Sequence, residues 1–173
     1  MIKAGIIGGA GYTGGELIRL LLNHPKVELD FVFSRSQAGK PLHHLHQDLL
    51  GETNLKFTDS FQAKVDVVFL CMGHGESSKF LESNPLDSET KIIDLSQDYR
   101  LDDSKVYGLP ELNREGIKGA DFVANPGCFA TAIQLALLPL AEGRLLTNDI
   151  HVNAITGSTG AGQKPGATTH FSW

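Results

Sequence analysis

The sequence has few cysteines, no long apolar run and no excess of basic residues. Cys71 and Cys128 are the only cysteines among 173 residues, which excludes a disulfide-stapled secreted scaffold. The net charge of −5 argues against nucleic acid as the main partner, and no apolar run is long enough to span a bilayer. The first residues, MIKAGIIGG, lack the basic and apolar regions of a signal peptide. We therefore expect a cytoplasmic protein with reduced thiols, no nucleic-acid partner and no membrane association.

Short apolar strands alternate with helical segments along the chain. Strand signals occur at residues 2–7, 27–33, 65–72, 91–95, 121–124 and 151–156. Apolar residues recur with helical spacing at residues 16–22, 76–82 and 129–140. This alternation predicts an α/β fold, a Rossmann-type doubly wound sheet that is mostly parallel.

Residues 39–64 show no clear periodicity, and they hold three histidines, His43, His44 and His46. Close histidines without a distant cysteine or carboxylate pattern do not complete the coordination shell of a metal ion. We therefore expect a solvated loop or helix here, and no metal site.

A glycine-rich loop directly follows the first expected strand. Residues 9–14 read G-A-G-Y-T-G and fit G-x-G-x-x-G, and counting from Gly8 also gives G-x-x-G-x-x-G. Between a strand and a helix, this pattern is typical of a loop whose backbone binds the pyrophosphate of a dinucleotide. The alternative is a turn that only joins the strand to the helix. The residues expected to bind the cofactor here are Gly8, Gly11, Tyr12, Thr13 and Gly14.

The end of the second expected strand indicates which dinucleotide is bound. An NAD site has a carboxylate about 20 residues after the glycine loop, where it binds the ribose 2′-hydroxyl. This chain has Ser34, Arg35 and Ser36 there, while Glu28 and Asp30 come too early in the strand. A guanidinium pairs with phosphate through two hydrogen bonds, so Ser34 and Arg35 favour NADP over NAD. The alternative for Arg35 is an exposed charge after a strand.

Gly73, His74 and Gly75 follow the third expected strand, at the sheet edge where ligands of α/β proteins bind. The two glycines allow the backbone to pass close to the cofactor, so all three residues are expected at the cofactor site. His74 is either a catalytic acid or base, or a residue that shapes the loop.

Cys128 lies at the start of a predicted helix. Pro126 and Gly127 form a turn that ends the preceding strand, and helical spacing begins directly afterwards. Unpaired N–H groups and the macrodipole at a helix N-terminus favour the thiolate form of a cysteine. The pattern predicts a nucleophile, and the alternative is a buried structural cysteine.

Five segments together resemble the N-acetyl-γ-glutamyl-phosphate reductases, a family of the semialdehyde dehydrogenase superfamily. They are residues 8–17 (GGAGYTGGEL), 94–100 (DLSQDYR), 106–114 (VYGLPELNR), 125–128 (NPGC) and 158–165 (STGAGQKP). YGLPELNR and NPGC are the most specific of these segments. The glycine loop alone would also suit the aspartate-semialdehyde dehydrogenases.

The resemblance implies the NADPH-dependent reduction of N-acetyl-γ-glutamyl phosphate to N-acetylglutamate 5-semialdehyde, with release of phosphate, in arginine biosynthesis. It implies that Cys128 forms a thioester with the substrate and that backbone N–H groups at the start of its helix stabilise the oxyanion. The resemblance also implies cofactor contacts at Ser96, Gly160 and Ala161, and substrate contacts at Asn125, Ser158 and Gly162.

Members of this family are considerably longer than this chain, and their second domain carries a catalytic histidine whose motif no segment here matches. We therefore expect residues 1–147 to form the NADP-binding domain, including the nucleophile turn and helix. Residues 148–173 are expected to be only the first strand and glycine-rich loop of a second, α+β catalytic domain, which associates subunits into a homo-oligomer. The chain then resembles an N-terminal fragment. Two alternatives remain: an enzyme like aspartate-semialdehyde dehydrogenase, and a dinucleotide-binding module without catalytic activity.

Overall fold

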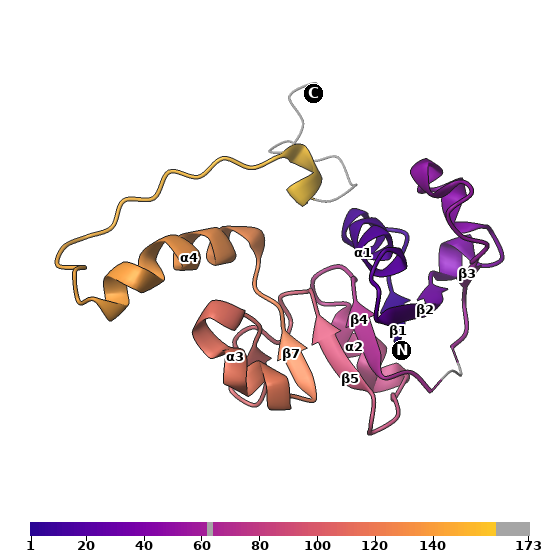
Figure 1. Cartoon of the computed structure of the whole chain (residues 1–173), viewed down its shortest axis with the longest axis horizontal. Helices are drawn as coiled ribbons and strands as arrows, with labels where there is room; N and C mark the ends of the chain where they lie inside the picture. Colours follow the sequence, from indigo (N-terminus) through magenta and orange to yellow (C-terminus); the bar gives the residue numbers. More distant parts are fainter. Residues whose placement is uncertain (62–63, 162–173) are drawn as a thin grey trace.

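The computed structural model describes residues 1–61 and 64–161, which form a seven-stranded parallel sheet with helices on both faces (Figure 1). The predicted α/β Rossmann-type fold is confirmed. The strands and helices are β1 (Ile2–Ile7), α1 (Tyr12–Leu22), β2 (Val27–Phe33), β3 (Phe57–Thr58), β4 (Val67–Leu70), α2 (Ser77–Ser83), β5 (Lys91–Asp94), β6 (Val106–Tyr107), α3 (Pro110–Gly119), β7 (Phe122–Ala124) and α4 (Cys128–Glu142).

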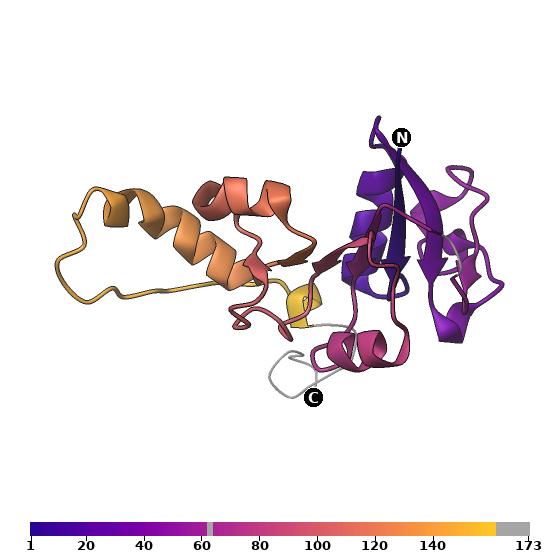
Figure 2. The same cartoon turned by 90° about the horizontal axis from the view of Figure 1, so that it is seen from below.

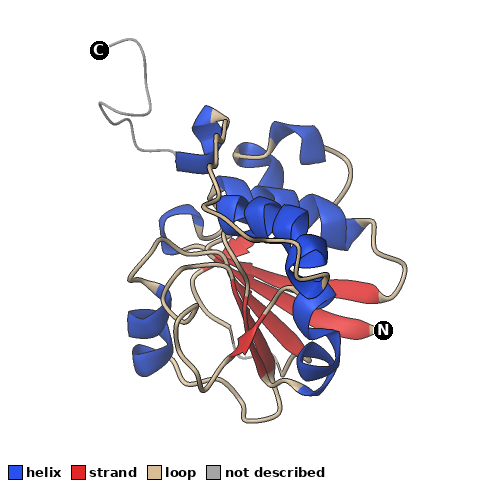
Figure 3. Cartoon of the chain, turned by 90° about the vertical axis from the view of Figure 1, so that its left-hand side faces the viewer, coloured by secondary structure: helices blue, strands red, loops and turns tan. Residues whose placement is uncertain are grey.

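The strand order is β3-β2-β1-β4-β5-β7-β6, and Figure 3 shows these strands as one fan with helices on either side. From β1 the chain winds outward to β3. From β4 it winds in the opposite direction through β5 to the edge strand β6, and β7 then lies between β5 and β6. The direction reverses between β1 and β4, which pair in parallel with Ile7 opposite Leu70. In open α/β sheets, ligands bind in the crevice at the carboxyl ends of such a pair. The loops that follow β1 and β4 are therefore placed at the expected binding edge.

Two apolar layers cover the sheet because successive side chains of a strand point to opposite faces. Ile6 packs with Ile18 of α1 in one core, and Ile7 packs with Phe80 of α2 in the other. Both cores are built around β1 and its two neighbours. The core thus fixes the position of the strand that leads into the glycine loop.

The segment between β2 and β4 contradicts the expectation of a solvated loop or helix. It contains two short 3-10 helices, η2 (Leu42–His44) and η3 (Gln47–Leu49), and the strand β3. Leu42, Leu49 and Phe57 are buried in the core that also holds α1. These apolar residues are too widely spaced to form a helix or strand period, so the sequence pattern did not reveal them. The described residues include no group of His, Cys, Asp and Glu side chains arranged to hold a metal ion.

The part after β7 differs from the core in its burial. No residue of α4 is buried, and in Figures 1 and 2 this helix projects away from α1 and β2. The strand expected at residues 151–156 is absent from the described structure, where this stretch pairs with no strand and Ile155 is 100% exposed. A strand forms only where a neighbour accepts its backbone hydrogen bonds, and none is present here. Within the described ranges, no helix is long and apolar enough to cross a membrane.

Adjacent leucines test whether the segment between β2 and β4 is part of the core. Leu49 is 4% exposed, and Leu50 is 71% exposed. We expect Leu49→Ala to lower the free energy of unfolding by about 2–5 kcal/mol, because it leaves a cavity beside α1. The matched control Leu50→Ala should change it by less than about 0.5 kcal/mol. Denaturant titration measures both values, and similar small changes in the two variants would contradict the described packing.

Candidate functional site

The three glycines of the G-x-G-x-x-G sequence have different surroundings. A Cβ atom on Gly9 would collide with the side chain of Val32, and one on Gly14 would lie 2.7 Å from the carbonyl oxygen of Gly8. A Cβ on Gly11 would make only an ordinary van der Waals contact, 3.8 Å from the carbonyl oxygen of Gly8, so this side of the glycine is uncrowded and open to approach. Dinucleotide-binding loops use their glycines in this way, for the tight turn, for access of the pyrophosphate and for close helix packing. The loop therefore fits a dinucleotide.

The start of α1 completes a site for an anion. The helix begins at Tyr12, and its N-cap residue Gly11 offers no side chain to the first N–H groups. Such groups, together with the helix dipole, favour a phosphate. A cavity of about 350 Å³ lies beside them and is lined by Ala10, Tyr12, Glu16, Arg19, Ser36, Gln37, Leu45 and His46. The glycine loop, the end of β2 and the η2–η3 segment thus surround one hollow.

Ser34 and Arg35 lie at the carboxyl end of β2, as predicted. Ser34 is buried, and its N–H donates a hydrogen bond to the carbonyl of Thr58 at 2.8 Å. The exposed guanidinium of Arg35 lies 5.8 Å from the centre of the Phe33 ring. Arg35 forms no ion pair with any residue in the described part of the chain. Its sequence neighbours Ser36 and Gln37 line the hollow, and its charge is not engaged in an ion pair with any described residue.

The loop after β4 is bound to the loop after β5. His74 Nδ1 accepts a hydrogen bond from the N–H of Gln97 at 3.1 Å. The Asp98 carboxylate accepts hydrogen bonds from the N–H groups of Gly75 at 2.6 Å and Ser78 at 3.1 Å. Burial acts to raise the pKa of Asp98, but the hydrogen bonds from Gly75 and Ser78 outweigh it and lower this pKa below its usual value. The carboxylate thus caps α2 from a distant part of the sequence.

Ser96 is a buried residue of the loop that follows β5. It is 1% exposed, and its hydroxyl donates to a carboxylate oxygen of the buried Asp94 at 2.7 Å. The same hydroxyl oxygen accepts a hydrogen bond from the N–H of Asp98 at 3.0 Å. The structure therefore shows Ser96 supporting the loop that holds His74 and Gly75, and its contact with a cofactor stays a prediction.

Arg100 holds the turn before Cys128. Its Nε donates to the carbonyl of Asn125 at 2.8 Å, and one terminal nitrogen donates to the carbonyl of Leu95 at 2.9 Å. A Cβ on Gly127 would lie 2.9 Å from the other terminal nitrogen, so glycine lets the guanidinium pack against the turn. The expected substrate residue Asn125 is therefore fixed through its backbone.

The two cysteines have different surroundings in the structure. Cys128 is the first residue of α4, and it is exposed beside the N–H groups of the first helical turn. Cys71 follows β4, and burial, together with the nearby Asp94 carboxylate, raises the pKa of its thiol to about 12. Only Cys128 has both the access and the local dipole that a nucleophile requires.

Both the glycine loop and Cys128 lie at the carboxyl edge of the sheet. β4 and β5 separate β1 from β7, and at about 4.8 Å between neighbouring strands the two ends are about 14 Å apart. The 3-10 helix η4 (Ser158–Ala161), the short yellow helix of Figures 1 and 2, lies near the beginning of α4 in both views. The expected substrate residue Gly162 lies outside the described residues. An extended ligand along this edge can reach both the glycine loop and the thiol.

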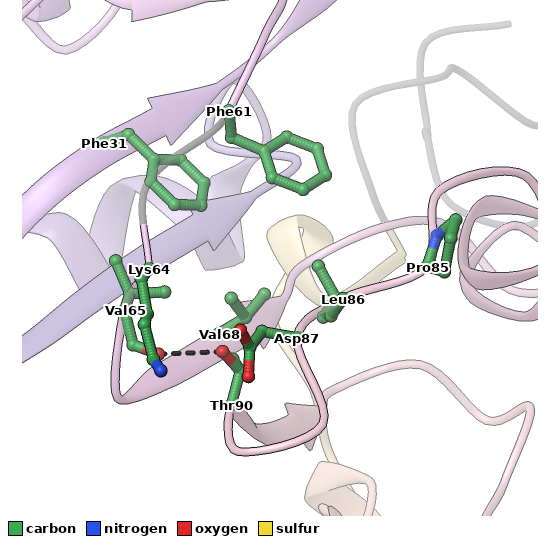
Figure 4. Close-up of a pocket in the computed structure, with 9 residues that line it drawn as sticks. All are labelled: Phe31, Phe61, Lys64, Val65, Val68, Pro85, Leu86, Asp87 and Thr90. Carbon is green, nitrogen blue, oxygen red and sulfur yellow. Dashed lines mark hydrogen bonds between the residues drawn. The ribbon is translucent and has the colours of Figure 1, made fainter.

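A second cavity, of about 220 Å³, lies away from this edge (Figure 4). Its lining residues include Val65 and Thr90, which come just before β4 and β5. The hydroxyl of Thr90 donates a hydrogen bond to the carbonyl of Val65 at 2.8 Å. Phe61 stacks on Phe31 at its border, with ring centres 5.4 Å apart. None of the predicted site residues lines it.

Sequence reasoning did not single out His46, Asp98 or Arg100 as site residues. Asp98 and Arg100 lie within the DLSQDYR segment, which was the available signal. Their partners Gly75 and Asn125 are 23 and 25 positions away in the sequence. Such pairs become visible only when the fold brings the loops together.

Two family models match the sequence. The first is described as semialdehyde dehydrogenase, NAD binding domain, and matches residues 3–120. The second is described as semialdehyde dehydrogenase, dimerisation domain, and matches residues 128–173. Together they cover nearly the whole chain, with Cys128 as the first residue of the second match.

Curated relatives are similar to the chain over its entire length. The N-acetyl-gamma-glutamyl-phosphate reductase of Christiangramia forsetii is 61% identical over 176 residues, and that of Bacteroides thetaiotaomicron is 61% identical over 177 residues. The matched regions are 100% of this chain and 55% of each relative. The chain therefore spans about half the length of these relatives.

Solved structures show the same fold. Aspartate semialdehyde dehydrogenase with NADP from Candida albicans superposes with a TM-score of 0.66 and 19% identity, covering 84% of this chain and 48% of that one. Aspartate semialdehyde dehydrogenase II from Vibrio cholerae, complexed with ASA, has a TM-score of 0.64 and 21% identity, with coverage of 82% and 47%. At these identities the likeness extends to the fold alone.

The different surroundings of the thiols predict selective alkylation. We expect iodoacetamide at neutral pH to label Cys128 in the folded protein, and to label Cys71 at least about 100-fold more slowly, because Cys71 is partly buried and its thiol has a raised pKa. Mass spectrometry of timed digests measures both rates. Unfolding in denaturant should make the two rates similar, and equal labelling in the folded protein would contradict the assignment.

The Asp98 cap predicts a pH-dependent contribution to stability. Asp98→Asn should lower the free energy of unfolding at neutral pH by about 1 kcal/mol, because an amide nitrogen would face an N–H donor of α2. The lowered pKa of Asp98 makes its contribution complete above the ordinary value of 3.8 and lost as the pH falls through the folded-state pKa. Denaturation at neutral pH and at about pH 3 measures the difference, which should shrink in acid. Asp59→Asn, at an exposed carboxylate, is the control, and an equal loss in that variant would contradict a specific cap.

Proposed function

The chain belongs to the semialdehyde dehydrogenase family, and from this membership we propose that it is the cofactor-binding and nucleophile-bearing part of an N-acetyl-γ-glutamyl-phosphate reductase. The observation that carries the proposal is the exposed Cys128 at the start of α4, on the same sheet edge as the glycine loop. The names of the relatives that match the whole chain support the choice of substrate. The reaction then reduces an acyl phosphate to a semialdehyde and releases phosphate in arginine biosynthesis.

The proposed chemistry begins with the Cys128 thiolate. It attacks the acyl carbonyl carbon, the bond from that carbon to the phosphate oxygen breaks, and a thioester remains on Cys128. Backbone N–H groups in the first turn of α4 donate to the oxyanion that forms in this step. When bound, NADPH supplies the hydride that reduces the thioester carbonyl. Collapse of the resulting thiohemiacetal breaks the carbon–sulfur bond, which releases the aldehyde and restores the thiolate.

We propose NADP(H) as the cofactor. The open side of Gly11 and the uncapped start of α1 support binding of the pyrophosphate. Arg35, which directly precedes the cavity-lining residues Ser36 and Gln37, is proposed to pair with the 2′-phosphate beside Ser34. The loop of Gly73, His74 and Gly75 is proposed to pass beside the cofactor at the switch point of the sheet.

The substrate contacts and the assembly of the protein are proposed from the neighbourhood of Cys128. We propose that Asn125, Ser158 and Gly162 contact the acyl phosphate, since Asn125 lies three residues before Cys128 and residues 158–165 resemble a segment of the reductases. Residues 1–147 are proposed as the cofactor domain and residues 148–173 as the start of the second domain. The match to a dimerisation domain and the lack of buried residues in α4 support a homo-oligomer of the full-length protein.

The function is tested on the full-length protein by running the reaction backward. N-acetylglutamate 5-semialdehyde and phosphate should drive reduction of NADP, and omission of phosphate should abolish it. Cys128→Ala should lower the rate by at least about 1,000-fold because no thioester can form, whereas Cys71→Ala is the control and should remain active. An active Cys128→Ala variant, or a preference for aspartate semialdehyde, would overturn the proposal.

The role of Arg35 predicts a change in cofactor preference. Arg35→Leu should weaken NADPH binding by about 10–100-fold, because hydrogen bonds between charged groups are lost, and leave NADH binding nearly unchanged. Fluorescence titration with each cofactor gives the two affinities. Lys118→Leu removes a positive charge from α3 and should leave both affinities unchanged. If Arg35→Leu lowered the affinities for NADPH and NADH equally, Arg35 would not bind the 2′-phosphate.

A further inference from the structure

His46 forms a buried hydrogen bond to the glycine loop. The residue lies between η2 and η3 and is 8% exposed. Its Nε2 is 2.8 Å from the carbonyl oxygen of Gly9, which is the first glycine of the G-x-G-x-x-G sequence. Because a carbonyl oxygen only accepts hydrogen bonds, Nε2 must carry the proton and donate.

The imidazole of His46 is held from several sides. A Cβ on Gly15 would lie 2.6 Å from Cε1 and 2.8 Å from Nδ1 of the ring, so only glycine at this position of α1 admits the imidazole. The Phe57 ring lies on another side, with its centre 6.1 Å from that of the imidazole. The backbone of His46 donates to the carbonyl of Leu42 at 3.1 Å and accepts from the N–H of Leu49 at 2.9 Å. The position of the donor is thus set by packing.

A charged pair attaches the same segment to α1. Arg19 donates to the two carboxylate oxygens of Asp48 at 2.6 Å and 2.7 Å. This hydrogen-bonded pairing with Arg19 lowers the pKa of Asp48 to about 2. Arg19 lies in α1, and Asp48 lies in η3, two residues after His46. The ion pair therefore keeps the η2–η3 segment against α1. Both His46 and Arg19 line the hollow beside the glycine loop.

We propose that His46 is a positioning residue for the pyrophosphate-binding loop, an inference that rests on the proposed cofactor function. A peptide group is planar, so the hydrogen bond to the Gly9 carbonyl fixes the orientation of the whole peptide between Gly9 and Ala10. That peptide leads directly into Gly11, whose open side is the proposed approach for the pyrophosphate. Loss of the donor would leave a carbonyl without its partner and allow the loop to turn away from the binding orientation.

Replacing His46 or His44 by phenylalanine tests whether His46 acts on cofactor binding or only on the stability of the fold. His46→Phe keeps a planar ring but removes the donor, and we expect it to weaken NADPH binding to the full-length protein by about 10-fold or more. His44→Phe is the matched control at an exposed position and should change the affinity by less than about two-fold. Calorimetric titration measures binding, and thermal melting is recorded for each variant. His46→Gln returns an N–H donor and should recover part of the affinity lost in His46→Phe.

The outcomes distinguish this inference from the proposed function. If the unaltered protein binds neither NADPH nor NADH, the cofactor assignment fails, and the role of His46 fails with it. If the unaltered protein binds NADPH and His46→Phe binds it equally well, only the positioning role is overturned. A lower melting temperature with unchanged affinity also overturns it, because a purely structural histidine would give that result.

If His46→Phe does not fold, the proposal can be tested on the unaltered protein. Nitrogen-15 NMR of the imidazole should show Nε2 protonated in the folded protein, and NADPH should shift the His46 signals more than those of His44. A deprotonated Nε2, or equal responses of the two histidines, would overturn the proposal.

Discussion

The parallel pairing of β1 with both β2 and β4 is the constraint on which the site depends. It aligns Ile7 with Phe33 on one side and with Leu70 on the other, so that three strands end at one level. The chain leaves β1 through Gly8, whose φ of 86° is in the left-handed region that glycine adopts readily. A Cβ there would lie 2.6 Å from the carbonyl of Cys71, so the two strand ends approach as closely as backbone atoms allow. Any larger residue at Gly8 would separate the loops that form the binding edge.

Side chains from neighbouring loops then fix the loops at that edge. His46 binds the glycine loop, Asp98 binds the loop after β4, and Arg100 binds the turn before Cys128. Each hydrogen bond stabilises the fold by only about 1 kcal/mol, but each is directed at a backbone group whose orientation matters for a ligand. Their combined effect is to hold the loops in place before any ligand arrives, which lowers the entropic cost of binding.

Local patterns predicted the strands that build the sheet, and they failed where the structure depends on distant partners. The bounds of β1 and β2 were predicted correctly because apolar residues are concentrated in each and turn residues border them, with a glycine cluster after β1 and Asn23-His24-Pro25 before β2. The core role of Leu49 was missed because its apolar partners lie far away in the sequence. The strand expected at residues 151–156 was wrong for the opposite reason, since an apolar pattern is present but no neighbouring strand is available to it within the described chain. The glycine loop between β1 and α1 and the turn before α4 were located correctly because each is marked by consecutive residues.

The two cysteines show how surroundings, rather than residue type, determine chemistry. Each follows a parallel strand at the same edge of the sheet, and the sequence around Cys71 alone does not exclude it as a nucleophile. Cys71 continues the ladder by donating its N–H to the carbonyl of Ile7 at 2.7 Å, and its thiol turns into the protein, where a thiolate is disfavoured. Pro126 and Gly127 interrupt the same path after β7, so the chain turns outward and Cys128 begins a helix in contact with solvent. The short turn before Cys128 therefore places this thiol in contact with solvent at the start of a helix, whereas the strand end at Cys71 leaves its thiol partly buried.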